Sequence, residues 1–137
     1  MTPEIFGLSS LINGLVTFSL GVFVLWNNWK SKINRLYFLM VVSITIWALS
    51  YWRWMISDNA ETALFWVRML SIGSTLIPIF YFHWVVSLLK LEKKQKYAVR
   101  LVYFLAFLFL IFSFSDLFIK GVRAKAIFSF WPDPGIL

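Results

Sequence analysis

The sequence predicts an all-α fold, a polytopic bundle of four transmembrane helices that forms one membrane domain over residues 1–137. Hydrophobic residues make up 61% of the chain and charged residues only 14%, which leaves too little polar surface to cover a soluble globule. The apolar runs each reach the roughly 20 residues that a helix needs to cross a hydrocarbon core of about 30 Å. They also lack the strict alternation of a membrane β-barrel strand. The runs are Ile5–Asn27, Leu36–Ile56, Ala63–Leu89 and Tyr97–Ile119.

Positive charge is concentrated in two of the links between these runs. Residues 28–35 and 90–100 are rich in Lys and Arg, whereas residues 1–4 and 57–62 contain acids and no basic residue. Because short cytoplasmic loops retain Lys and Arg, we expect the basic links inside the cell and the N-terminus outside. Residues 120–137 then form an outer segment with turn-forming residues towards its end.

This topology also accounts for most of the net charge of +7. Basic loops at the inner face of a membrane lie beside anionic lipid, so the charge needs no nucleic acid as a partner. The expected partner is the lipid bilayer, and the expected location is the inner (plasma) membrane, which the chain crosses several times.

Two arginines lie in the hairpin of helices that runs from Trp47 to Pro78. Arg53 is within ~8 Å of the link between the helices and can extend to water, whereas Arg68 lies about 9–10 Å from it. An unpaired arginine at that depth is costly, so Arg68 should face protein or an aqueous cavity. Asp116, near the outer end of the fourth run, is the best acid in this chain for either arginine. A partner outside the chain stays open.

The same region supplies the candidate ligand-sensing residues. An anionic or polar ligand could bind Arg68 beneath nearby indole and phenol rings, or Arg68 could be a structural residue whose charge is satisfied by protein. Both interpretations stay open. The candidate ligand-sensing residues are Arg68, Trp66, Trp47 and Tyr51.

The third run contains the candidate hinge and proton-sensing residues. Pro78 removes one backbone hydrogen bond near the middle of the predicted helix, and Gly73 makes bending easier, so the two are hinge candidates. A static kink that improves packing is the alternative. His83 is the only histidine of the chain. It is a candidate proton sensor, and a hydrogen-bonded packing role is the alternative.

Catalysis and metal binding are not expected. The chain has no cysteine, one histidine and no clustered carboxylates, so the usual catalytic sets and metal sites cannot be assembled. We therefore expect no enzyme activity, no metal and no cofactor. A small transporter or transporter fragment is an alternative, because Arg68, His83 and a broken helix could serve transport. Neither an internal repeat nor paired broken helices support it.

A set of residues in a characteristic order resembles the N-terminal seven-helix membrane sensor region of bacterial histidine kinases, which also occurs on diguanylate cyclases. Nearly the whole chain is covered, and Trp131–Gly135 is similar to the outer segment before that family's fifth helix. The other residues that show the resemblance are Asn34, Trp47-Ala48-Leu49, Tyr51, Ala63, Phe65-Trp66, Arg68, Gly73 and Pro78.

The resemblance implies a sensory input region truncated after its fourth helix. Its partners would be the missing helices and a cytoplasmic output domain, whose motifs do not occur in this sequence. A homodimer is a further candidate assembly. On this interpretation the chain is the input part of a two-component or related signal-transduction protein, and it does not itself catalyse a reaction.

Overall fold

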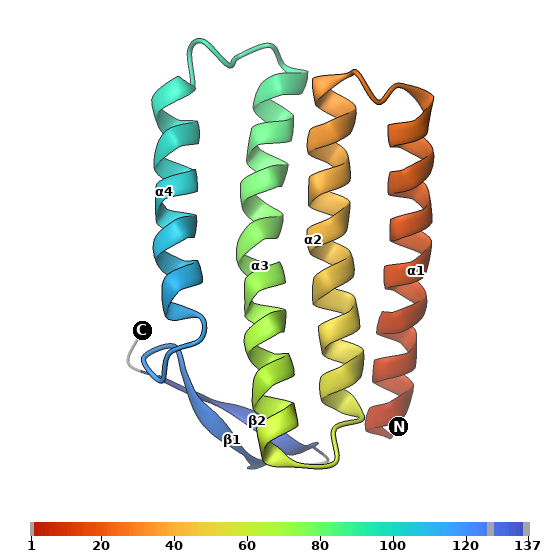
Figure 1. The fold of residues 1–137 in the computed structure, drawn as a ribbon, viewed down its shortest axis with the longest axis vertical. Helices are drawn as coiled ribbons and strands as arrows, with labels where there is room; N and C mark the ends of the chain where they lie inside the picture. Colours follow the sequence, from red (N-terminus) through yellow and green to blue (C-terminus); the bar gives the residue numbers. More distant parts are fainter. Residues whose placement is uncertain (1, 126–127, 136–137) are drawn as a thin grey trace.

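The computed structural model describes residues 2–125 and 128–135 and contains four helices followed by a β-hairpin (Figure 1). Successive helices run in opposite directions because short links join them. The helices are α1 (Pro3–Asn27), α2 (Lys32–Met55), α3 (Ala60–Leu88) and α4 (Lys96–Phe112), and the strands are β1 (Ile119–Lys125) and β2 (Phe128–Pro134).

Local signals in the sequence explain where the helices begin. Pro3 occupies the first turn of α1, where its missing N–H costs no hydrogen bond. The side chain of Ser31 caps α2, and the side chain of Asn59 caps α3 by accepting a hydrogen bond from the backbone N–H of Thr62 at 2.8 Å. The amide of Asn34 donates to the carbonyl of Val24 at 3.0 Å, which holds the α1–α2 link against the end of α1.

Three of the four predicted spans are confirmed as helices that are long and apolar enough to cross a membrane, namely α1, α2 and α3. The prediction for the fourth was too long, because α4 ends at Phe112 instead of Ile119. Hydroxyl residues explain the early end. Ser113 donates its backbone N–H to the carbonyl of Leu110, and the Ser115 hydroxyl donates to the carbonyl of Phe112 at 2.7 Å. Such local bonds favour turns over further helix.

The prediction for the outer segment also needs a correction, because the segment forms strands. The fold is therefore mostly helical instead of all-α. β1 and β2 pair antiparallel, with Val122 opposite Pro132 and Arg123 opposite Trp131. A two-stranded ribbon leaves each strand one unpaired edge, which is where proline is tolerated. Parts of the predicted segment, at residues 126–127 and 136–137, lie outside the described residues.

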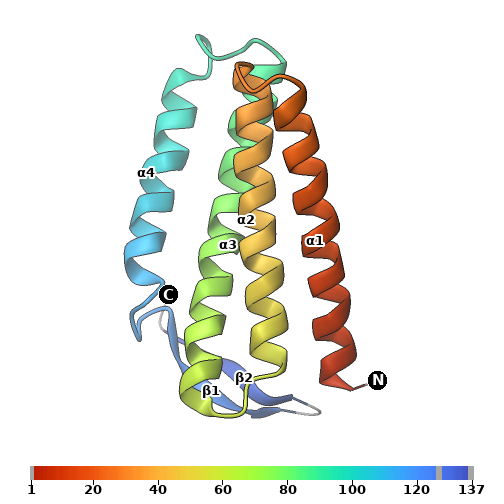
Figure 2. The same ribbon diagram turned by 45° about the vertical axis from the view of Figure 1, so that its right-hand side comes forward.

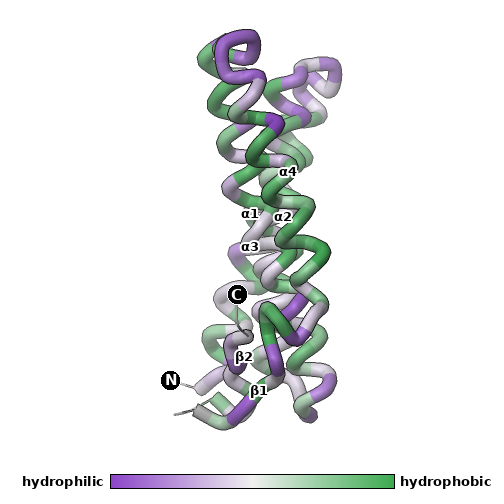
Figure 3. The backbone as a smooth tube through the Cα atoms, turned by 90° about the vertical axis from the view of Figure 1, so that its left-hand side faces the viewer, coloured by the Kyte–Doolittle hydropathy of each residue, from purple (hydrophilic) through white to green (hydrophobic). Residues whose placement is uncertain are grey.

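The helices stand in one row, in the order α1, α2, α3, α4, and each packs against its neighbours in sequence (Figures 1 and 2). Seen from the side, the row is narrow, with hydrophilic residues gathered at its two ends (Figure 3). One end carries the α1–α2 and α3–α4 links, and we call it the basic end. The other carries the N-terminus, the α2–α3 link and the β-hairpin, and we call it the hairpin end. The predicted grouping of links is thus confirmed, whereas the direction in the membrane is not tested by the structure.

Small residues let the first three helices approach closely. A Cβ placed on Gly14 would lie 2.9 Å from the Cβ of Ala48, and one placed on Gly73 would lie 2.8 Å from the backbone nitrogen of Trp47. Ala48 and Ala63 are fully buried. Close helix contact through small side chains is the usual way for membrane helices to gain packing energy.

Candidate functional site

The hairpin end is organised around Trp54. Its indole Nε1 donates to the carbonyl of Phe130 at 2.6 Å, and its ring lies against the rings of Phe128 and Trp131. Beneath it lies a buried cluster that includes Ala63, on α3, and Ile119, at the start of β1. The hairpin therefore packs on α2 and α3, and residues distant in sequence form one buried core at the hairpin end.

Arg68 joins this hairpin to α3. Its side chain is 16% exposed, and Nη2 donates to Oδ1 of Asp116 at 2.9 Å and to the carbonyl of Ile119 at 3.1 Å. The Asp116 side chain is 84% exposed. Nε of Arg68 is buried and has no hydrogen-bond partner among the described residues. The expectation that Arg68 needs a partner, with Asp116 as the best acid, agrees with this geometry.

Arg53 has a different environment. It is exposed, and its guanidinium lies over the rings of Trp52 and Trp66, 5.8 and 5.4 Å from their centroids. Trp66 and Arg68 are two residues apart on a helix and so point in nearly opposite directions. The indoles of Trp52 and Trp66 therefore surround Arg53, and Arg68 lies on the side of the hairpin.

Trp47 and Tyr51 lie together on α2. Their rings stack with centroids 5.6 Å apart, and they line an open recess of about 290 Å³ between α1 and α2. Polar groups of Ser9, Ser10 and Asn13 line the opposite wall. The structure brings the four candidate ligand-sensing residues together only in part. Trp47 and Tyr51 line the recess beside α1, Trp66 lies by Arg53, and Arg68 contacts the hairpin, whereas Tyr51 and Trp66 both pack against the buried cluster that includes Ile119.

The hinge candidates lie on opposite sides of the same helix. Gly73 is buried against the backbone of Trp47 and the carbonyl of Ser43, so it has a packing role in the α2–α3 seam. Pro78 is exposed, and α3 continues through it without a break. Pro78 has no N–H, so the carbonyl of Ser74 loses its α-helical donor.

His83 lies towards the basic end. Its Nδ1 is 2.9 Å from the hydroxyl of Tyr103 on α4, and the two rings meet edge to face. Nearby, Glu92 in the α3–α4 link accepts a hydrogen bond from the Lys32 ammonium at 2.5 Å and one from the Ser87 hydroxyl at 2.6 Å. These bonds, with the one from Lys32 the stronger, hold the pKa of Glu92 below its usual value.

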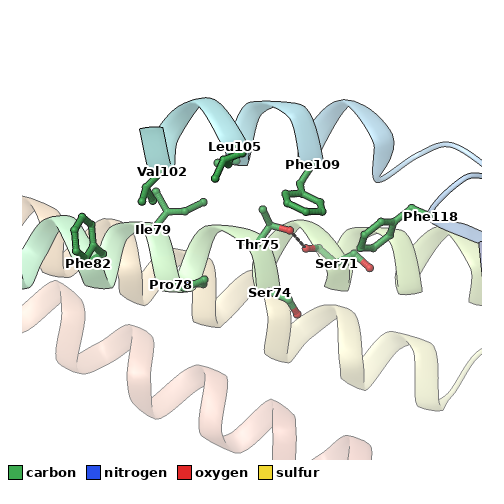
Figure 4. A pocket seen from close by; sticks show the side chains of 11 residues that line it. Ser71, Ser74, Thr75, Pro78, Ile79, Phe82, Val102, Leu105, Phe109 and Phe118 are labelled. Carbon is green, nitrogen blue, oxygen red and sulfur yellow. Dashed lines mark hydrogen bonds between the residues drawn. The ribbon is translucent and has the colours of Figure 1, made fainter. Parts of the chain in front are cut away.

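Sequence reasoning missed a groove between α3 and α4 (Figure 4). It has a volume of about 560 Å³, within the range of ligand pockets. From α4, Leu105 and Phe109 face α3, and Phe118 closes the hairpin end. A signal was present, since four residues of α3 that line the groove recur at i, i+3, i+4 and i+7 and so share one helix face. They are Ser71, Ser74, Thr75 and Pro78.

Comparison with known proteins matches the chain to a protein family. The model of a protein family described as the N-terminal 7TM region of histidine kinase matches residues 9–137, which is most of the chain. No curated protein and no solved structure matches.

Proposed function

The chain belongs to the family of N-terminal seven-transmembrane regions of histidine kinases, and from this premise we propose that it is the membrane-embedded sensory input of a bacterial signalling protein. It detects a ligand or a membrane state at its outer half and controls a cytoplasmic output domain of the same protein, a kinase or a diguanylate cyclase. The match to an N-terminal 7TM region supports the proposal that the chain is an input region and carries out no reaction itself.

The proposed orientation has the hairpin end outside the inner membrane, with α4 as a fourth crossing segment. The observation in favour is that both links at the basic end are rich in Lys and Arg. At about 1.5 Å per residue, the 17 residues of α4 extend roughly 25 Å, so it would need local thinning of the bilayer or extension by its flanking turns.

The absence of native cysteine allows a direct test of orientation. Single cysteines replace Asn59 at the hairpin end and Lys93 at the basic end. A membrane-impermeant maleimide should label the first in intact cells and the second only after permeabilisation. Labelling of Lys93→Cys from outside would reverse the orientation.

The observation that carries the mechanism is the contact of Arg68 with Asp116 and the carbonyl of Ile119. A ligand shifts a conformational equilibrium only if it binds two states with different affinity. We propose that the two states differ in whether this contact holds the hairpin on α3, and that Pro78 lets the two halves of α3 tilt. A ligand that competes for Arg68 would release the hairpin.

The test compares the two arginines in the complete protein. Arg68→Ala should lock output in one state, because it removes the contact, whereas Arg53→Ala should change output little, because the Arg53 guanidinium is exposed and lies over indole faces. Equal and mild effects from both substitutions would contradict the mechanism.

The output domain has a simpler test. The coding sequence should continue beyond Leu137 into further helices and an output module. A stop codon directly after Leu137 would contradict the proposed control of an attached domain. A homodimer, if it transmits the signal, should appear as intersubunit cross-linking of cysteines introduced on α1 or α4.

His83 is the proposed proton sensor of this region. Its contact with Tyr103 joins α3 to α4, so a change in its protonation would alter the hydrogen bond between the two helices. His83→Gln should flatten the pH dependence of output, and Tyr103→Phe should do the same. A pH profile unchanged in both variants would leave His83 a packing residue.

A further inference from the structure

The α3–α4 groove combines apolar walls with a polar gap. Its lining consists mostly of aliphatic and aromatic side chains, among them Ile79, Leu105 and Phe109. Ser74 and Pro78 also line it. They lie four residues apart, so the Ser74 carbonyl, which points along the helix towards Pro78, lies between two lining residues.

The nearby hydroxyls do not satisfy that carbonyl. The hydroxyl of Ser71 donates to the carbonyl of Val67 at 3.1 Å, and the hydroxyl of Thr75 donates to the carbonyl of Ser71 at 2.8 Å (Figure 4). Both donors are therefore engaged one turn earlier. A backbone acceptor without its helical donor is unfavourable in a hydrocarbon environment, where water cannot replace the lost bond. The groove thus favours an occupant that brings a donor.

From these observations we infer that the α3–α4 groove binds a single-chain amphiphile whose hydroxyl group donates to the Ser74 carbonyl and whose aliphatic chain lies along Leu105 and Phe109. A phospholipid acyl chain fits the apolar walls but offers no donor. A hydroxyl-bearing chain satisfies both parts of the groove. The inference names a ligand class for the sensory region, and its signalling consequence rests on the function proposed above.

The groove also has a position suited to signalling. Phe118, at its hairpin end, directly precedes Ile119, whose carbonyl accepts from Arg68. A chain that fills the groove contacts Phe118 and so favours one position of the segment that Arg68 holds. Occupancy of the groove and the state of the Arg68 contact are therefore coupled.

The test is photolabelling of the protein in lipid nanodiscs with two probes, a diazirine derivative of octanol and the matching diazirine derivative of octane. At equal mole fraction in the bilayer, the octanol probe should label groove residues about three- to tenfold more, the affinity difference expected from one net hydrogen bond. Labelled peptides are identified by mass spectrometry. Equal labelling by the two probes would assign the groove to lipid chains and overturn the inference.

Two variants separate shape from hydrogen bonding. Leu105→Trp should block labelling of the groove by both probes, whereas Leu101→Trp, one turn away on α4 and not part of the lining, should leave it unchanged. Pro78→Ala restores an N–H for the Ser74 carbonyl, so it should reduce octanol labelling to the octane level without changing octane labelling. Undiminished octanol labelling in Pro78→Ala would exclude the carbonyl as the acceptor.

The same experiment on the protein with all of its helices decides whether another helix covers the groove. Retained labelling supports the inference, and complete loss overturns it. Absence of groove labelling in a protein whose output still responds to Arg68→Ala would overturn the binding site while the proposed sensory function stands.

Discussion

The two faces of α3 are built in opposite ways. Towards α2, Gly73 packs against the backbone of Trp47 and the carbonyl of Ser43, and Ser43 is almost completely buried. Towards α4, a groove of about 560 Å³ separates the helices, and Ala106 is the only buried residue of α4. The comparison indicates that α4 can change position more readily than α1, α2 and α3 can separate from one another.

Polar contacts hold α4 at its two ends and near its middle. At the hairpin end, Arg68 binds Asp116 and the carbonyl of Ile119. At the basic end, Glu92 in the link before α4 accepts from Lys32 and Ser87. Near the middle of α4, the Tyr103 hydroxyl contacts His83. These few contacts beside a groove should let α4 move with no loss of the α2–α3 packing.

The largest effect on stability is expected where α2 and α3 pack closely. Gly73→Val places side-chain carbon where a Cβ alone would lie 2.8 Å from the backbone nitrogen of Trp47 and 3.0 Å from the carbonyl of Ser43. Backbone cannot yield as a flexible side chain does, so the free energy of unfolding should fall by about 3 kcal/mol. Unfolding in mixed micelles, followed by helical circular dichroism, measures the change.

Gly121→Val is the matched control for that substitution, because a Cβ at Gly121 meets nothing within 4 Å. Its effect on unfolding should stay within about 0.5 kcal/mol. If the two glycine variants were equally stable, α2 and α3 would not be as tightly packed as their buried surfaces indicate.

The next effect concerns the contact that holds the hairpin. Arg68→Ala removes two hydrogen bonds from a largely buried guanidinium, and the net contribution of a hydrogen bond to a charged group is about 1.5–3 kcal/mol. The hairpin should open locally, so amide hydrogens of β1 should exchange faster while those of α2 should not. Exchange followed by mass spectrometry separates the two regions.

Asp116→Asn measures how much of that effect comes from the ion pair. The Asp116 carboxylate is largely exposed, so its ion pair is screened and its loss should cost less than about 1 kcal/mol. The bond to the Ile119 carbonyl remains. Exchange in Asp116→Asn that equals exchange in Arg68→Ala would mean that the ion pair alone holds the hairpin.

The contact between α3 and α4 should tolerate a larger side chain, whereas the contact between α2 and α3 should not. Ala106→Val adds two methyl groups beside the groove, where there is room for them, so the free energy of unfolding should change by less than about 1 kcal/mol. The same micelle unfolding measures it. A loss as large as that of Gly73→Val would show that α4 is packed as tightly as α2.

The spans and the need of Arg68 for a partner could be predicted from the sequence, because long apolar runs and a buried charge have consequences that no tertiary detail changes. The residue at which α4 ends could not be predicted. The apolar run continues through Phe114 and Leu117, and competing local bonds of Ser113 and Ser115 favour the end of the helix. The hairpin was missed because two short strands with Gly121, Pro132 and Pro134 resemble a loop in composition.

The candidate site could be predicted only in part from the sequence. The sequence gives the depth of a residue in the membrane, and depth does not give the direction in which its side chain points. Trp66 and Arg68 lie at similar depth but on nearly opposite sides of α3. Helices that are apolar on every face give no periodic signal for which face packs, so the separation of Trp47 from Arg68 required the structure.

The smallest effect is expected at the basic end and depends on pH. The bonds from Lys32 and Ser87 lower the pKa of Glu92 in the folded protein, so the stability they give is present above the carboxyl's unfolded pKa of about 4.5. It is lost as the pH falls through the lower folded value. Amide exchange in the α3–α4 link should therefore accelerate on acidification, and less so in Glu92→Gln, which cannot titrate.

Because the Lys32–Glu92 pair is exposed, added salt should weaken it too, whereas the α2–α3 contact should respond to neither salt nor pH. Equal acceleration in the variant would mean that the link is not held by Glu92, and α4 would then be anchored where Arg68 reaches the hairpin and where His83 contacts Tyr103.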